Sequence, residues 1–219
     1  ISLATVGTRD GCTKDVRRLC RRNSVRVLQA GRRKGITTPS VQDTSASTAT
    51  AMQPSPLSLK VMTVNTHKGF AALNRRFILP ELRDAVRTVG ADVVFLQEVL
   101  GTHSRHSRTI QNWPQAPHYE FLADTMWPQF AYGRNAVYPR GHHGNAVLSK
   151  FPIVQHRNHD VSLGGVEKRG LLHCTLRLPG RTTEVHTICA HLGLSEEQRE
   201  QQLMLLCHIV RDEVPADAR

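Results

Sequence analysis

The sequence has few cysteines, no long apolar run and no aromatic residue before position 57. Its five cysteines are an odd number without the spacing of a disulfide framework, which favours a reducing compartment over the secreted, disulfide-bonded class. No apolar run reaches the ~18 residues of a membrane-spanning helix, and no apolar segment follows an N-terminal basic patch as in a secretory signal. We therefore expect a soluble, cytoplasmic protein without a membrane span.

Acidic residues are scarce in the first 56 positions. The chain of 219 residues has a formal net charge of +11, and this segment alone holds 10 basic and 3 acidic residues. A stretch rich in Arg, Ser, Thr and Ala cannot bury enough apolar surface to offset its ordering entropy. We predict a disordered basic N-terminal arm over 1–56 and one domain over 57–219.

The hydrophobic spacing after residue 56 is typical of an α/β arrangement. Apolar runs at 57–65 and 91–99 flank a helical spacing at 78–89, which predicts a strand, helix, strand unit. Residues 101–144 lack a clean period and are predicted to form a long loop region with short elements. Ser195 opens a capping box and a terminal helix. The remaining strand-like runs, expected to form an antiparallel meander, are 144–149, 152–161, 169–178 and 183–190.

Three polar residues follow the predicted strands where catalytic groups tend to lie. Asn65 ends the first strand, Glu98 ends the second and His191 follows the last. A carboxylate beside an amide can hold Mg²⁺, which prefers one or two carboxylates together with waters and phosphate oxygens. Each residue alone also has a structural explanation, because Glu98 could pair with a surface cation, Asn65 could cap a turn and His191 could be a core histidine.

Five short motifs decide between these interpretations, because they occur together and in a fixed order. They are TVNTHKG (63–69), VVFLQEV (93–99), HGNAVLSKFPI (143–153), EKRGLLHC (167–174) and AHLGLS (190–195). With them the chain resembles the endonuclease/exonuclease/phosphatase superfamily of metal-dependent phosphoesterases, in particular its bacterial cytoplasmic members, over about Leu59 to Val210. The resemblance implies the α+β class and a deoxyribonuclease-like four-layer α/β/β/α sandwich of two packed mixed sheets.

The resemblance also implies roles for individual residues. Glu98 is the principal ligand of Mg²⁺ or Mn²⁺, and Asn65 supports the metal or the phosphate. His191 binds a phosphate oxygen or assists proton transfer, which suits an imidazole. Asn145 and Arg169 approach the same site, where an amide and a guanidinium can bind phosphoryl oxygens, although Arg169 could instead orient another side chain.

Two motifs of the superfamily are missing from this chain. Neither the Gly-Asp-x-Asn motif, whose Asp orients the attacking water, nor the Ser-Asp-His motif occurs in it. We therefore expect a C-terminally incomplete fragment that lacks the last strands of the sandwich and is inactive by itself. The implied substrate is a phosphodiester or phosphomonoester, with nucleic acids among the substrates of the family, and no oligomeric state is implied.

Other functions are open at this stage. A zinc site could form from His173, Cys174, His186, Cys189 and His191, although strand alternation places them on different faces. A serine hydrolase is disfavoured because no Gly-x-Ser-x-Gly motif occurs. A non-enzymatic nucleic-acid-binding protein would use the arginines of the arm and stack aromatic residues of the loop region, such as Trp127, on bases.

Overall fold

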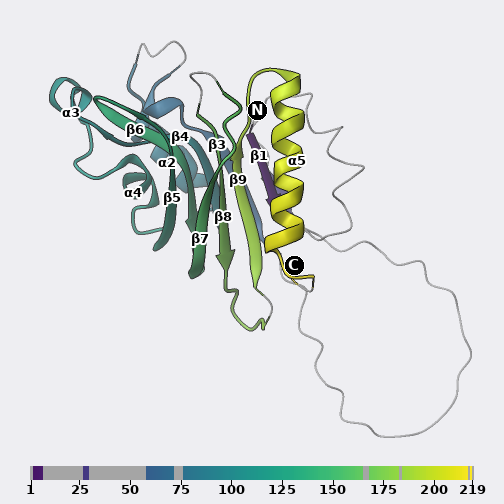
Figure 1. Ribbon diagram of the computed structural model, residues 1–219. Helices are drawn as coiled ribbons and strands as arrows, with labels where there is room; N and C mark the ends of the chain where they lie inside the picture. Colours follow the sequence, from purple (N-terminus) through teal and green to yellow (C-terminus); the bar gives the residue numbers. More distant parts are fainter. Residues whose placement is uncertain are drawn as a thin grey trace, which may run out of the picture.

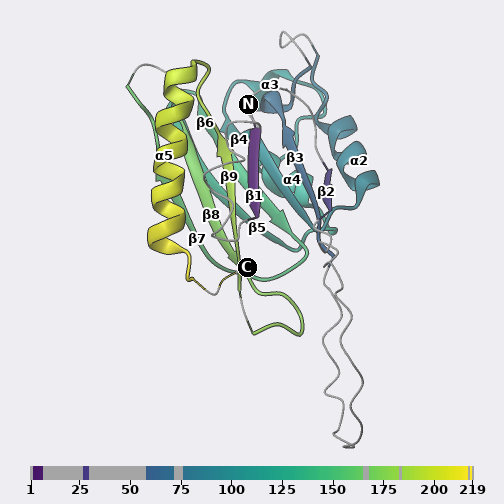
Figure 2. The same ribbon diagram turned by 90° about the vertical axis from the view of Figure 1, so that its right-hand side faces the viewer.

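The protein forms two β-sheets packed face to face, with helices on both outer faces (Figures 1 and 2). The computed structural model describes residues 2–6, 27–29, 58–71, 76–164, 168–182, 184–216 and 218. This is the predicted α+β sandwich of four layers. Its elements are β1 (Ser2–Val6), β2 (Val27–Gln29), β3 (Lys60–Asn65), η2 (His67–Gly69), α2 (Leu79–Val89), β4 (Val93–His103), α3 (His106–Thr109), α4 (His118–Ala123), β5 (Gln129–Tyr138), β6 (Gly141–Ser149), β7 (Ile153–Asp160), β8 (Gly170–Leu176), β9 (Val185–His191) and α5 (Glu196–Glu213).

The first sheet is mixed and has the strand order β2-β3-β4-β6-β5. Strands β3 and β4 are parallel and α2 connects them, which confirms the predicted strand, helix, strand unit. Helix α2 ends at Gly90, whose φ of +61° is a left-handed conformation that glycine adopts readily. The buried side chains Leu79 and Val86 pack α2 onto the sheet, in one cluster with Trp127, whose Nε1 donates to the carbonyl of Ala91 at 2.9 Å.

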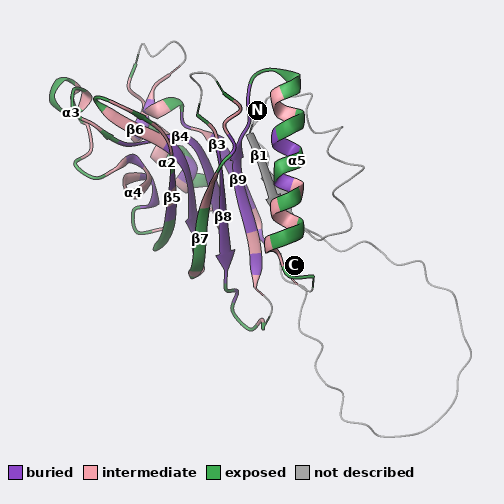
Figure 3. Cartoon of the chain, viewed as in Figure 1, coloured by how far each residue is buried: buried purple, intermediate pink, exposed green. Residues whose placement is uncertain are grey.

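The second sheet has the order β1-β9-β8-β7 and all its described neighbours are antiparallel. Alternate residues of β8 and β9 face the first sheet, where Leu172 and Cys189 pack with Phe95. The other residues face α5 and form a separate cluster with Leu203 and Leu206. The strands at the centre of both sheets are therefore buried on both faces, whereas α5 alternates between buried and exposed positions (Figure 3). The predicted cap of α5 is confirmed, since Ser195 Oγ accepts from the backbone N–H of Gln198 at 3.2 Å.

The connections differ from the sequence-based expectation in the region 101–149. The run 144–149 is part of β6, which pairs with β4 and β5 in the first sheet, so the meander consists of β7, β8 and β9 only. The predicted loop region contains α3, α4 and the ten-residue strand β5. Strand β5 lies at the edge of the sheet, and its mixture of exposed and half-buried residues explains why no regular period was evident.

Two short strands lie within the segment 1–56 that was predicted to be a disordered arm. Strand β1 pairs with β9 and strand β2 with β3, each in antiparallel register. Both cover the backbone groups of a neighbour that would otherwise be an edge strand, which is a physical reason for short segments of this arm to be ordered. The arginines proposed to bind nucleic acid, from Arg17 to Arg33, lie outside the described residues.

No helix in the described part of the chain is long and apolar enough to cross a lipid bilayer.

Candidate active site

Glu98 lies in the middle of β4, at a β-bulge, and not at a strand end as predicted. The register of β4 against β6 shifts here, so that Gln97 and Glu98 stand opposite one β6 residue, Asn145. The φ of Glu98 is +53°, a left-handed conformation that costs a residue with a Cβ about 1–3 kcal/mol. The bulge interrupts the alternation of side chains: Gln97 is fully buried and donates to Thr63 Oγ1 at 3.0 Å, while Glu98 is only partly buried. A strained backbone therefore turns this carboxylate out of the core.

Asn65 is the last residue of β3 and fixes the orientation of the Glu98 carboxylate. Its Nδ2 donates to Oε1 of Glu98 at 3.0 Å, and its Oδ1 accepts from the backbone N–H of His67 at 2.9 Å. The parallel pairing of β3 with β4 sets this contact, because Asn65 stands beside Gln97 in the register. The structure thus brings two of the predicted residues together.

His191 reaches the same carboxylate from the second sheet. Its Nε2 lies 3.6 Å from Oε1 of Glu98, and the residue is 7% exposed. Burial lowers the pKa of His191 and the charge of Arg169 lowers it further, while Glu98 opposes both effects. The imidazole is therefore neutral at pH 7 and can accept a proton or a hydrogen bond at one ring nitrogen.

Two basic residues of the short turn η2 complete this side of the site, and the sequence analysis did not single them out. Lys68 Nζ lies 3.5 Å from Oε2 of Glu98, and His67 Nδ1 lies 3.9 Å from the same atom. Both have positive φ, +45° for His67 and +58° for Lys68, so strained backbone lies on both sides of the carboxylate. Burial alone raises the pKa of Glu98, but the hydrogen bond from Asn65 and the charge of Lys68 outweigh burial and hold the pKa below its usual value. The carboxylate is therefore ionised at neutral pH.

His143, on β6, is a further residue that the sequence analysis did not assign. Its Nδ1 is buried without a hydrogen-bond partner among the residues that the structure describes. Burial lowers the pKa of His143 to about 4, Lys68 and Arg169 lower it, and Glu98 raises it, which places all three charges near this ring. A neutral ring nitrogen with no partner is suited to meet a ligand. The HGN sequence at 143–145 was the available signal, because His143 directly precedes the buried part of β6.

Asn145 is next to the site but points into the protein. It is fully buried, and Nδ2 donates to the carbonyls of Gly170 at 2.8 Å and Cys189 at 3.3 Å, which joins β6 to β8 and β9. Both amide hydrogens are thus used, so the predicted contact of this amide donor with a phosphoryl oxygen would require it to leave these carbonyls. Arg169, directly before β8, acts on the site through its charge, which lowers the pKa of both His143 and His191.

A cavity of about 370 Å³ adjoins the site at Lys68. Its other walls are mostly rings: the imidazoles of His103 and His106, which stack with centroids 3.6 Å apart, and the phenol of Tyr138, whose ring lies 5.8 Å from that of His143. Phe70 and Leu100 also line the cavity among the residues that the structure describes. The cavity therefore joins the cationic side of the site to a surface made mostly of rings.

The residues of the alternative zinc site do not converge. Cys174 and Cys189 lie between the sheets, where burial raises the pKa of both thiols, that of Cys189 to about 12. His173 and His186 lie on the other face of the second sheet, and His191 lies at Glu98.

Among the aromatic residues, Trp127 is fully buried and belongs to the core, so it cannot stack on a base.

Comparisons with known proteins agree with this geometry. The family model described as "Endonuclease/Exonuclease/phosphatase family" matches residues 62–219. Over 160 residues the chain is 59% identical to proteins named "Uncharacterized protein YbhP" in Escherichia coli K12 and Shigella flexneri. That alignment includes 73% of this chain, which spans only 63% of the length of these curated relatives.

Solved structures show the same arrangement of sheets. An endonuclease/exonuclease/phosphatase from Beutenbergia cavernae superposes with a TM-score of 0.53 and 25% identity, over 72% of this chain and 44% of that one. A family protein from Leptotrichia buccalis has a TM-score of 0.51 and 16% identity, over 71% and 63% of the two chains, and supports the fold alone. From the family model and the shared sandwich it follows that this chain belongs to the endonuclease/exonuclease/phosphatase family.

Proposed function

We propose that the protein is a divalent-metal-dependent phosphoesterase of the nuclease or phosphatase type. One observation supports this most: the bulge in β4 holds an ionised carboxylate between Asn65 of one sheet and His191 of the other. Family membership supports hydrolysis of a phosphate ester, and the cationic side chains Lys68 and Arg169 would attract such an anion.

The residues present fit a hard cation. Glu98 is a carboxylate with a lowered pKa, and the Oδ1 atom of Asn65 keeps a second lone pair beside its bond to His67. These two residues would hold Mg²⁺ or Mn²⁺, which when bound withdraws negative charge from a phosphoryl group. His191 and His143 would then bind the phosphate oxygens or move a proton at a ring nitrogen, since both are neutral at pH 7.

We further propose that the 219-residue chain has little turnover by itself. The Gly-Asp-x-Asn motif, whose Asp would orient the attacking water, does not occur in this sequence. The predicted cytoplasmic location belongs to the same proposal and is supported by Cys174 and Cys189, which are buried free thiols in the described part of the chain.

Binding of inorganic phosphate tests the proposal without requiring turnover. The chain should bind phosphate more tightly with Mg²⁺ than without, and Glu98→Gln should remove that difference. Hydrolysis of bis(p-nitrophenyl) phosphate by the chain should not exceed that by Glu98→Gln. If the wild-type chain hydrolyses the diester and Glu98→Gln does not, only the proposal of low turnover is wrong. If phosphate binding depends on neither Mg²⁺ nor Glu98, the proposed phosphoesterase site is wrong.

A further inference from the structure

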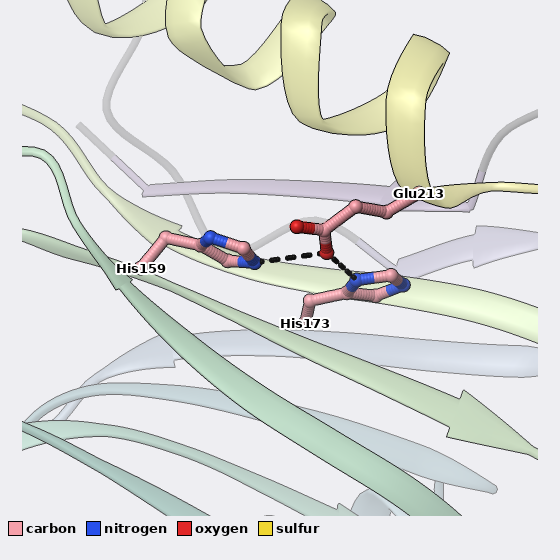
Figure 4. A group of neighbouring side chains, drawn as sticks. All are labelled: His159, His173 and Glu213. Atoms are coloured by element: carbon pink, nitrogen blue, oxygen red, sulfur yellow. Dashed lines mark hydrogen bonds and ion pairs between the residues drawn. The ribbon is translucent and has the colours of Figure 1, made fainter.

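A second cluster of chemically active side chains lies on the face of the second sheet that α5 covers. It consists of His159 on β7, His173 on β8 and Glu213 in the last turn of α5 (Figure 4). Both imidazoles and the carboxylate point to a common centre, although they come from three separate elements. Side-chain exposures of 13% for His159, 8% for His173 and 29% for Glu213 show that the centre is largely shielded from water.

The two separations between Glu213 and the histidines match those of neighbouring ligand atoms around a tetrahedral metal ion. Oε2 of Glu213 lies 3.1 Å from Nε2 of His159 and 3.3 Å from Nδ1 of His173, and all three atoms lie within 4.8 Å of one another. Zinc bonds of about 2.0–2.2 Å in tetrahedral geometry place neighbouring ligand atoms about 3.3 Å apart. The Nε2 atom of His159 is buried and its approach to Glu213 lacks the geometry of a hydrogen bond, so this nitrogen is available as a ligand.

The surroundings also prepare His173 to bind a metal. Its Nε2 lies 2.8 Å from Nδ1 of His186, so a hydrogen bond there can hold the proton on Nε2 and leave the Nδ1 lone pair facing Glu213. Metal-binding histidines commonly donate their second ring nitrogen in this way. Arg157 contacts the other carboxylate oxygen of Glu213 at 3.2 Å and holds it in place.

We propose that His159, His173 and Glu213 bind a divalent transition-metal ion of the zinc class. Two imidazoles and one carboxylate are a ligand set that such ions prefer, whereas Mg²⁺ prefers oxygen ligands as at Glu98. The site is separate from the candidate active site, because His191 faces the first sheet and His173 faces α5. The ion would join the last turn of α5 to β7 and β8, and water would occupy the fourth position.

Zinc binding by the untagged 219-residue chain tests this proposal. After chelator treatment and in excess Mg²⁺, calorimetric titration with ZnCl₂ should show one tight equivalent and a higher Tm. Co²⁺ should give the visible absorption of a tetrahedral ion. His159→Gln, and Glu213→Gln in a second protein, should weaken zinc binding more than about tenfold.

Two controls separate this site from others. His156→Gln removes an exposed histidine of the same strand, and Glu98→Gln removes the carboxylate of the other site; neither should change zinc affinity. Circular dichroism at matched concentration checks that each variant is folded; His159 is chosen for substitution because its side chain is less buried than that of His173. Absence of a tight zinc equivalent, or affinity unchanged in both His159→Gln and Glu213→Gln, would overturn the proposal.

Discussion

Asn65 donates its Nδ2 hydrogen to Oε1 of Glu98 at 3.0 Å, and this bond joins the end of β3 to the bulge in β4. The same oxygen lies 3.6 Å from Nε2 of His191, which comes from the other sheet. One carboxylate is thus contacted from both halves of the sandwich. The position of this carboxylate depends on how the two sheets are placed relative to each other. Substitutions in the core between the sheets should therefore displace it.

The first prediction concerns the strained backbone at Glu98. Because its φ is +53°, glycine should be the more stable replacement here, and Glu98→Gly should exceed Glu98→Ala in free energy of unfolding by about 1 kcal/mol. The exposed β4 residue Thr102 is the control, where Ala should be the more stable by about 0.5–1 kcal/mol. Urea unfolding of the four variants measures both differences. If Ala is preferred at both positions, the bulge is not strained.

The second prediction concerns the link between the sheets. Asn145→Ala removes two buried hydrogen bonds, to Gly170 and Cys189, and should lower the free energy of unfolding by about 2–3 kcal/mol. The exposed amide Gln155 serves as the control, and Gln155→Ala should cost less than about 0.5 kcal/mol. Equal effects of the two changes in urea unfolding would show that Asn145 does not hold the sheets together.

The third prediction concerns the pH dependence of stability. His118 is 1% exposed, and burial lowers its pKa from 6.5 to about 3, with smaller contributions from His106 and His103. The buried, neutral His118 contributes its full stability at pH values above the pKa of 6.5 that it has in the unfolded chain. As the pH falls below that value, only the unfolded chain takes up a proton at His118, so the free energy of unfolding decreases. The decrease should reach about 2 kcal/mol at pH 5.

Replacement by an apolar ring removes this proton-linked loss. For His118→Phe, the difference in free energy of unfolding between pH 7 and pH 5 should be smaller than for the wild type by about 2 kcal/mol. Urea unfolding at both pH values measures it. An unchanged difference would show that His118 is protonated in the folded protein as readily as in the unfolded chain.

The fourth prediction concerns phosphate binding. Lys68 lies 3.5 Å from Glu98 and lines the adjoining cavity, so Lys68→Met should weaken the binding of inorganic phosphate in Mg²⁺ by about tenfold. Lys150→Met is the matched control, because Lys150 pairs with Asp92 at 3.0 Å and contributes to no described contact of the site. Similar losses in both variants, measured by calorimetry, would mean that only the net charge matters.

The sequence identified which residues of the candidate site lie together better than it predicted the backbone that holds them. Motif order was enough to select Asn65, Glu98 and His191, and the structure places all three in contact. The bulge was not predictable, because VVFLQEV is typical of a buried strand interrupted by two polar residues, and nothing in it signals a positive φ. Lys68 and His143 were missed because their proximity to Glu98 arises only when a turn and a third strand meet.

The second histidine cluster could not be predicted for a related reason. His159, His173 and Glu213 are separated by 14 and 40 positions, far from the short ligand spacings of zinc motifs. Alternation along β8 correctly separates His173 from Cys174, but the pairing partners of an antiparallel sheet and the contact with α5 are tertiary information. For the same reason β6 was assigned to the wrong sheet.

Direct binding of Mn²⁺ tests the central claim, that Glu98 holds a hard divalent cation. The free Mn²⁺ signal in electron paramagnetic resonance is measured in zinc-free buffer, because Zn²⁺ binds such sites more tightly than Mn²⁺ and would displace it. The wild type should bind one Mn²⁺, Glu98→Gln should bind it at least about tenfold more weakly, and Glu213→Gln should bind it like the wild type. Equal Mn²⁺ affinity of the wild type and Glu98→Gln would contradict the claim.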